Sequence, residues 1–189
     1  MRVIAGSARG RNLKSPPRPR ASGRPGIRPT SDLVRGVIFD MLGSMGASYD
    51  RVLDLYAGSG ALGVEALSRG DGTADFVEQD PDGIATIRTN LALTGFDARA
   101  AVHQIPAALA TSRLRGPYTL VLADPPYYDT DAIATVEAVA SSALVGPDTV
   151  LVLEHHRRMQ APDTLGPLVL YRRRRHGDTV VSIYEQEAA

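Results

Sequence analysis

The chain contains no cysteine among its 189 residues, and it has only four histidines. Without cysteine there is no disulfide, no thiolate metal site and no cysteine nucleophile. The histidines lack HExxH-type spacing, which argues against a zinc site. No apolar run reaches the roughly 20 residues that a transmembrane helix needs. The basic N-terminus also lacks the apolar stretch of a secretory signal. We therefore expect a cytoplasmic protein without a membrane partner or a metal.

Acidic and basic side chains balance to a net charge of zero, but they are unevenly distributed. Residues 1–35 hold nine basic side chains against Asp32 alone, a net charge of +8, and the remaining residues carry −8. A basic arm on an acidic body indicates a polyanionic partner for the arm. A solvated tail would have the same composition, so charge by itself leaves both interpretations open.

The apolar periodicity predicts an α/β protein. Residues 1–14 are typical of a small hairpin, and residues 15–29 hold five prolines, which marks a linker. From residue 51 strands alternate with helices, which predicts one mostly parallel, doubly wound domain over 30–189, with 1–29 as its extension. Two antiparallel strands should close the sheet at a turn around Gly177. Strands are expected at 51–57, 74–80, 98–104, 118–127, 149–156 and within 168–185, and helices at 31–42, 60–69, 81–93, 106–113 and 130–144.

The first strand leads directly into a glycine-rich turn, residues 58–63 (GSGALG), that opens a helix. Glycines let the backbone approach a ligand closely, and the helix N-terminus offers free N–H groups. The pattern predicts a nucleotide-type cofactor, which is either a nicotinamide or flavin dinucleotide or S-adenosylmethionine. Glu78, at the end of the second strand, suits the ribose hydroxyls of either cofactor, although it also fits a helix N-terminus. Asp54 favours S-adenosylmethionine, because an acid there suits cationic groups better than a pyrophosphate.

The fourth strand ends in Asp124-Pro125-Pro126-Tyr127. In an open α/β sheet this loop should face the glycine-rich turn across the crevice at the strands' carboxyl ends. An exocyclic amine of a base is a poor nucleophile, but the Asp124 carboxylate and the Pro125 carbonyl can accept its two hydrogen bonds and aim its lone pair. The prolines hold that carbonyl in place, and Tyr127 offers a ring on which a base can stack. The segment therefore predicts methylation of an amino group on a nucleic-acid base.

Three segments together resemble the RsmD-like family, which methylates N2 of a guanine in 16S ribosomal RNA. They are RVIAGSARGRNLKSPP, RPTSDLVRGVIFDML and VLDLYAGSGALGVEALSRG. The resemblance implies a Rossmann-like class I methyltransferase with a seven-stranded, mostly parallel sheet, a C-terminal antiparallel hairpin and an N-terminal β-hairpin extension. It also implies S-adenosylmethionine as cofactor and ribosomal RNA in small-subunit particles as partner.

The resemblance further implies roles for individual residues. The residues expected at the methionine end of the cofactor are Asp54, Tyr56, Gly58, Ser59 and Gly60. Glu78 would hold the ribose, and Gln79, Gln104 and Ile105 would border the adenine. The target base would lie against Asp124, Pro125 and Tyr127. The N-terminal motifs imply RNA contact, or closure of the cofactor site, by Arg9, Gly10, Arg11, Arg28, Pro29, Thr30 and Arg35.

Other functions fit parts of the pattern. A DNA amino-methyltransferase would use the same Asp-Pro-Pro-Tyr segment, but the chain has no room for a separate target-recognition domain. An RNA-binding assembly factor could keep the pocket without using it, although intact Asp124 argues against this. A dinucleotide oxidoreductase is a more distant alternative. We expect a monomer whose target base is unpaired or flipped. The Arg172–Arg175 run should alternate between two faces of an edge strand, as a solvated edge or a second phosphate contact.

Overall fold

A computed structural model describes residues 1–17, 32–127 and 129–187. Its centre is one sheet whose strands follow the order β3-β2-β1-β4-β5-β8-β7-β6. The strands are β1 (Arg51–Leu55), β2 (Thr73–Glu78), β3 (Ala100–Gln104), β4 (Tyr118–Ala123), β5 (Val145–His156), β6 (Thr164–Leu165), β7 (Leu168–His176) and β8 (Thr179–Gln186). The first five strands in this order, from β3 to β5, run parallel to one another. Beyond β5 each strand runs antiparallel to its neighbour, in the pairs β5–β8, β8–β7 and β7–β6.

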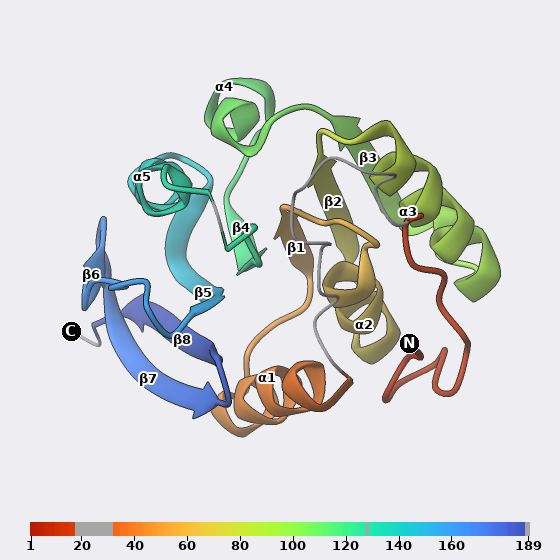
Figure 1. Ribbon diagram of the computed structural model, residues 1–189, viewed down its shortest axis with the longest axis horizontal. Helices are drawn as coiled ribbons and strands as arrows, with labels where there is room; N and C mark the ends of the chain where they lie inside the picture. Colours follow the sequence, from red (N-terminus) through yellow and green to blue (C-terminus); the bar gives the residue numbers. More distant parts are fainter. Residues whose placement is uncertain (18–31, 128, 188–189) are drawn as a thin grey trace.

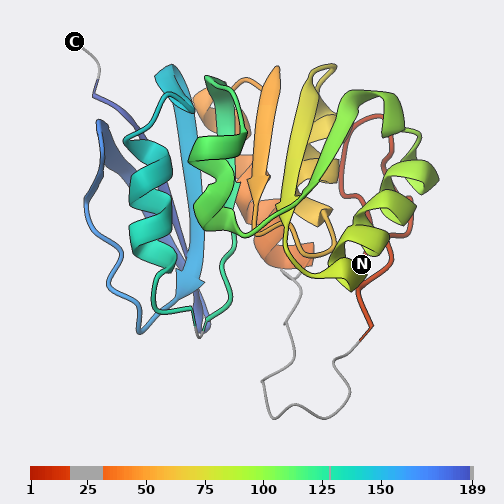
Figure 2. The ribbon, with the colours of Figure 1, turned by 90° about the horizontal axis from the view of Figure 1, so that it is seen from above.

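Helices cover both faces of the sheet (Figures 1 and 2). They are α1 (Asp32–Met45), α2 (Ala61–Arg69), α3 (Pro81–Thr94), α4 (Ala110–Arg113) and α5 (Ala132–Ala140), with short 3₁₀ turns at Asp97–Arg99 and Ala107–Leu109. One apolar core packs α1, α2 and α3 against one face, and a second core packs α4 and α5 against the other. Alternation along the buried strands divides their side chains between the two cores, as in Leu122 and Val121 of β4.

The sheet has eight strands in the described part of the chain, where the family resemblance implied seven. The additional strand is β6, whose two residues pair with Leu168 and Val169 at the start of β7. Two residues cannot show an alternating pattern, so no periodicity reveals this strand. The parallel series, the closing β7–β8 hairpin and the order of strands and helices are as predicted.

Strands β1 and β4 are neighbours at the centre of the sheet, with Asp54 opposite Leu122. The chain leaves β1 toward β2 and β3 on one side, whereas β4 continues to β5 on the other. Their carboxyl ends therefore flank the switch point where an open α/β sheet binds its ligand. This confirms the predicted placement of the two loops that follow β1 and β4.

The N-terminal segment forms a small hairpin. Arg2 and Asn12 form an antiparallel bridge, and the Val3 amide donates to the Arg11 carbonyl (3.0 Å). Buried Val3, Ala8 and Leu13 belong to the same core as α1 and α2, so the hairpin shares its interior with the main sheet. The predicted linker lies mostly outside the described residues. No helix within residues 1–17, 32–127 and 129–187 combines the length and hydropathy that crossing a bilayer requires.

Candidate active site

The turn between β1 and α2 contains three residues with positive φ in close succession. Tyr56 (φ 64°), Gly58 (55°) and Gly60 (75°) reverse the chain within five residues. Positive φ is unusual for tyrosine, and such strained backbone occurs where the surrounding structure fixes a functional loop. At Gly60 a side chain would also crowd Ile87 and Phe76, because an added Cβ would lie 3.2 and 3.3 Å from them. The turn therefore requires glycine at position 60, directly before helix α2 begins.

Glu78 is fastened to this turn from the end of β2. Its Oε2 accepts a hydrogen bond from the Gly58 amide (2.8 Å), and its Oε1 accepts from the amides of Gln79 and Asp80 (both 2.8 Å). Asp80, rather than Glu78, caps helix α3, because its side chain accepts from the Asp82 amide. Glu78 is therefore held in one orientation beside the glycine turn, as a ribose-binding carboxylate would need to be.

Asp54 is a buried acid directly beneath the turn. Its Oδ2 accepts a hydrogen bond from the Gly63 amide (2.8 Å) in the first turn of α2. Burial raises the pKa of Asp54 well above its usual range; the Gly63 hydrogen bond opposes this, and the charges of Asp124 and Glu78 add to it. The charges of Glu78 at the end of β2 and of Asp124 after β4 thus act on Asp54 of β1, and a cationic ligand group would relieve this repulsion.

The Asp124–Tyr127 segment follows β4, at the same edge of the sheet as the glycine turn that follows β1. Pro125 is buried, Asp124 is half-buried, and Tyr127 keeps 41% of its surface exposed. The Tyr127 hydroxyl forms a hydrogen bond with Thr179 Oγ1 (2.9 Å), and its ring lies 5.2 Å from the His156 ring at 58°. Tyr127 is therefore held at its hydroxyl and along one side, while part of its ring remains accessible for stacking.

His156 and Thr179 were not recognised from the sequence as parts of the site. They are directly opposite each other where β5 and β8 pair, so both side chains project from the same face of the sheet. Their approach to Tyr127 depends on the antiparallel register of two strands that are far apart in sequence, and no local motif encodes that register.

The residues assigned to the adenine gather at the carboxyl ends of β2 and β3. Gln104 pairs with Glu78 in register, and the Ile105 amide donates to the Glu78 carbonyl (3.1 Å). Gln79 and Gln104 are exposed, and Ile105 is partly buried. The three residues therefore lie together beside Glu78 at one edge of the sheet, and their contact with the adenine stays a prediction.

Asn90 of α3 links the glycine turn to the N-terminal segment. Its Nδ2 donates to the Ser59 carbonyl (2.8 Å) and the Lys14 carbonyl (3.0 Å), and its Oδ1 accepts from the Lys14 amide (2.7 Å). The side chain is fully buried. Sequence reasoning missed this residue, because a polar position within an otherwise ordinary helix carries no signal of such a role.

The residues assigned to RNA separate into three groups. Arg9, Gly10 and Arg11 are exposed at the turn of the N-terminal hairpin, as a contact with a polyanion requires. Arg28, Pro29 and Thr30 lie outside the described residues. Arg35 is completely buried, so the prediction that it contacts nucleic acid is wrong.

Arg35 instead binds the N-terminal hairpin to the body. Its guanidinium donates to the Arg2 carbonyl and to Asp32 (2.8 Å), and it forms an ion pair with buried Glu65 (3.6 Å). Glu65 also accepts hydrogen bonds from the amides of Ile4 (2.8 Å) and Ala5 (3.0 Å). The two N-terminal motifs of the sequence are therefore coupled through a buried ion pair.

Comparison with known proteins identifies the family. Residues 1–185 match the family described as Conserved hypothetical protein 95. The chain belongs to this family. A relative from Bacillus subtilis, Putative rRNA methyltransferase YlbH, is 36% identical, and the match covers 98% of this chain and 99% of the other. Ribosomal RNA small subunit methyltransferase D from Escherichia coli is 30% identical over 100% of this chain and 91% of its own.

A solved structure shares the fold of this chain. The structure of Putative methyltransferase yhhF from Escherichia coli superposes with a TM-score of 0.81 at 29% identity, and the match covers 100% of this chain and 99% of the other. The predicted membership of the RsmD-like family is therefore confirmed, and so is the class I methyltransferase architecture. No cluster of three or more histidine and acidic side chains that could hold a metal ion occurs in the described ranges.

Proposed function

We propose that the protein transfers a methyl group from S-adenosylmethionine to the N2 amine of a guanine in small-subunit ribosomal RNA. The observation that carries the proposal is the position of Asp124–Tyr127 at the end of β4, beside the glycine turn that follows β1. This juxtaposes an amine-binding segment with a cofactor loop. The relatives named as rRNA methyltransferases support ribosomal RNA as the substrate.

The residues present fit S-adenosylmethionine. The buried Asp54 and the half-buried Asp124 provide negative charge for a cofactor with sulfonium and ammonium groups. Glu78 is fixed by three backbone amides in the orientation that binding ribose hydroxyls requires. When bound, the cofactor supplies an electrophilic methyl group. A dinucleotide would instead bring a pyrophosphate toward three acids, which Coulomb repulsion disfavours.

The chain's own residues position the acceptor. The Asp124 carboxylate and the Pro125 carbonyl accept hydrogen bonds from the amine, which directs the nitrogen lone pair toward the methyl carbon. The bound cofactor, held by Asp54 and Glu78, would supply the methyl group that this nitrogen accepts. The extra proton on nitrogen leaves to Asp124 or to water. Tyr127, held by Thr179 and His156, fixes the plane of the base. Catalysis is therefore positioning and electrostatic stabilisation.

Replacing Asp54 by asparagine should stabilise the protein without cofactor and weaken cofactor binding. Because burial raises the pKa of Asp54, stability is lost as pH rises from the usual carboxyl range through the raised pKa. An asparagine side chain cannot ionise, so the free energy of unfolding at pH 7 should be higher in the variant than in the wild type. Affinity for S-adenosylhomocysteine, which keeps the ammonium group, should fall roughly 10–100-fold, because a charge-assisted hydrogen bond is lost.

Urea denaturation and calorimetric titration of the Asp54→Asn variant measure these two effects. Asp40→Asn, which removes an exposed carboxylate of α1, is the matched control and should change neither quantity. A variant that is less stable than the wild type at pH 7, yet binds the cofactor product normally, would contradict the proposed role of Asp54.

The proposed reaction is tested with small-subunit particles from cells that lack the gene for this protein. The purified protein and labelled S-adenosylmethionine are added, and nucleosides from the digested RNA are identified by mass spectrometry. We expect N2-methylguanosine at one site. Label in duplex DNA but not in the particles would instead identify a DNA amino-methyltransferase. Binding of S-adenosylhomocysteine without transfer to particles, free rRNA or DNA would identify a non-catalytic RNA-binding protein. The proposal also specifies that the substrate is the assembled particle, that the enzyme is a monomer and that it acts in the cytoplasm.

A further inference from the structure

A second basic segment lies at the opposite end of the chain from the N-terminal arm. Residues 155–179 hold six arginines and two aspartates, a net charge of +4. The preceding stretch, 36–154, holds six arginines against sixteen acids, a net charge of −10. Positive charge on an otherwise acidic body gathers on the loop between β5 and β6 and on strand β7, and a polyanion is the partner that such a patch attracts.

Both aspartates of this segment are already paired. Asp178 forms an ion pair with Arg157 (2.7 Å), and Asp163 forms one with Arg173 (3.2 Å). The other four arginines are therefore left without a matching acid of this segment. Of these, Arg158 and Arg174 are exposed, and their side chains form no hydrogen bond or ion pair with any described residue. Their guanidinium groups are available to a ligand.

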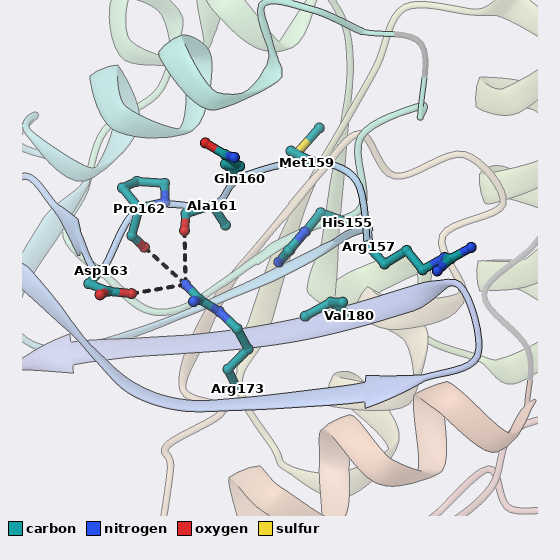
Figure 3. Close-up of a pocket in the computed structure, with 9 residues that line it drawn as sticks. All are labelled: His155, Arg157, Met159, Gln160, Ala161, Pro162, Asp163, Arg173 and Val180. Carbon is teal, nitrogen blue, oxygen red and sulfur yellow. Dashed lines mark hydrogen bonds and ion pairs between the residues drawn. The ribbon is translucent and has the colours of Figure 1, made fainter.

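The loop that carries Arg158 is held in a defined place. The Arg173 guanidinium donates to the carbonyls of Ala161 (2.9 Å) and Pro162 (3.3 Å), and its Nε donates to Ser182 on β8 (3.0 Å). Beneath the loop is a cavity of about 530 Å³, and Figure 3 shows how the Arg173 side chain reaches across from β7 to the loop carbonyls. Arg173 therefore has a structural role, because it fixes the loop over the β7–β8 hairpin.

The two exposed arginines, Arg158 and Arg174, lie near the residues that hold Tyr127. Arg158 follows His156 by two residues, and the Arg157 amide between them donates to the Asp178 carbonyl (2.8 Å), next to Thr179. Arg174 pairs with Val181, two residues along β8 from Thr179, so the Arg174 side chain projects from the same face as Thr179. Two residues of strand span about 6.7 Å. The two arginines thus flank the residues that hold the proposed stacking ring.

We propose that Arg158 and Arg174 bind backbone phosphates of the RNA strand that flanks the target base. This deepens the proposed function and rests on it. An edge strand can also carry arginines merely to prevent sheet-to-sheet pairing, and β7 has an open edge beyond its short pairing with β6. That explanation accounts for charge on β7, but it does not account for Arg158, which lies in a loop outside any strand.

The test compares the Arg158→Gln/Arg174→Gln double variant with the wild type on unmethylated small-subunit particles. Two lost phosphate contacts should raise KM roughly 10–30-fold at 0.1 M salt and reduce the slope of log affinity against log salt by about 1.4. The value of kcat should stay within about twofold, because the residues do not touch the reacting atoms. Arg158→Lys/Arg174→Lys should keep most of the slope. Arg88→Gln/Arg113→Gln, an equal loss of exposed charge on α3 and α4, is the matched control.

Filter binding of small-subunit rRNA in the same salt series separates the two proposals. If the wild type methylates the particles but the double variant keeps the wild-type KM and salt slope, the phosphate contacts are refuted and the proposed function stands. A variant that self-associates on gel filtration, while its monomer binds RNA normally, would show that the arginines only protect the edge. If no particle is methylated, the proposed function fails, and an unchanged binding slope would then refute the arginine contacts as well.

Discussion

Replacing Asp124 by asparagine should lower kcat for methyl transfer by about 10²–10⁴-fold, because it removes a charged acceptor aimed at the reacting amine. Asparagine keeps the size of the side chain, so the turn after β4 and the buried Pro125 should be undisturbed. Affinity for S-adenosylhomocysteine should change by less than about tenfold, since Asp54 and Glu78 remain. Single-turnover transfer to unmethylated particles measures the effect on chemistry apart from product release.

The matched control for Asp124 is Asp148→Asn, which removes an exposed carboxylate from β5 and should leave kcat unchanged. A second measurement concerns Asp54, whose pKa is raised in part by the charge of Asp124. Loss of that charge should lower the pKa of Asp54, which makes the stability of the variant less dependent on pH. If Asp124→Asn methylates at the wild-type rate, the amine-binding role assigned to the Asp124–Tyr127 segment is wrong.

Replacing Glu65 by alanine should destabilise the fold by about 3–5 kcal/mol, because a buried arginine would lose its only buried anionic partner within the described chain. The amides of Ile4 and Ala5 would also lose their acceptor, so the N-terminal hairpin should detach from α2. Urea denaturation measures the loss of stability. Faster hydrogen exchange at the amides of Val3 and Gly10 would report the detachment.

Two further variants separate the buried ion pair from the surface charge. Arg69→Met removes the partly exposed partner of Glu65 and should cost only about 1 kcal/mol. Arg35→Met/Glu65→Leu removes both buried charges together, and should be less destabilised than Glu65→Ala because no lone charge stays buried. If Glu65→Ala and Arg69→Met lower the free energy of unfolding equally, the buried Arg35–Glu65 pair contributes no more to stability than the partly exposed Arg69–Glu65 pair.

Much of the fold follows from local patterns in the sequence. The glycine turn lies where a strand gives way to a helix. The prolines of the Asp124 segment follow a strand that is apolar from Leu120 to Ala123, so both loops could be assigned from local sequence alone. Because β1 and β4 are the strands that flank the switch point of such a sheet, their loops had to meet. The alternation of the β7 arginines between two faces was likewise predictable, and Arg173 and Arg174 do pair with successive residues of β8.

The features that local patterns could not predict depend on long-range partners. An arginine is usually exposed, and nothing near Arg35 indicates that Glu65, 30 positions later, will form a buried pair with it. The contacts of Tyr127 with His156 and Thr179 depend on the register of β5 and β8. Similarly, Asn90 becomes part of the site only because α3 places it between the glycine turn and the N-terminal segment. These residues lack a motif because their roles arise from tertiary packing.

The attachment of the N-terminal hairpin has a consequence for synthesis on the ribosome. The hairpin is translated before its anchors, which are Glu65, Ser68 and Asn90, and the Lys14 amide lies 76 positions before the Asn90 side chain that it binds. Contacts between residues so far apart in sequence form late in folding, because closing the long loop between them costs chain entropy before the contacts can stabilise the protein. The residues of the hairpin can therefore dock only after α3 has been translated. Only then can Asn90 connect them to the glycine turn.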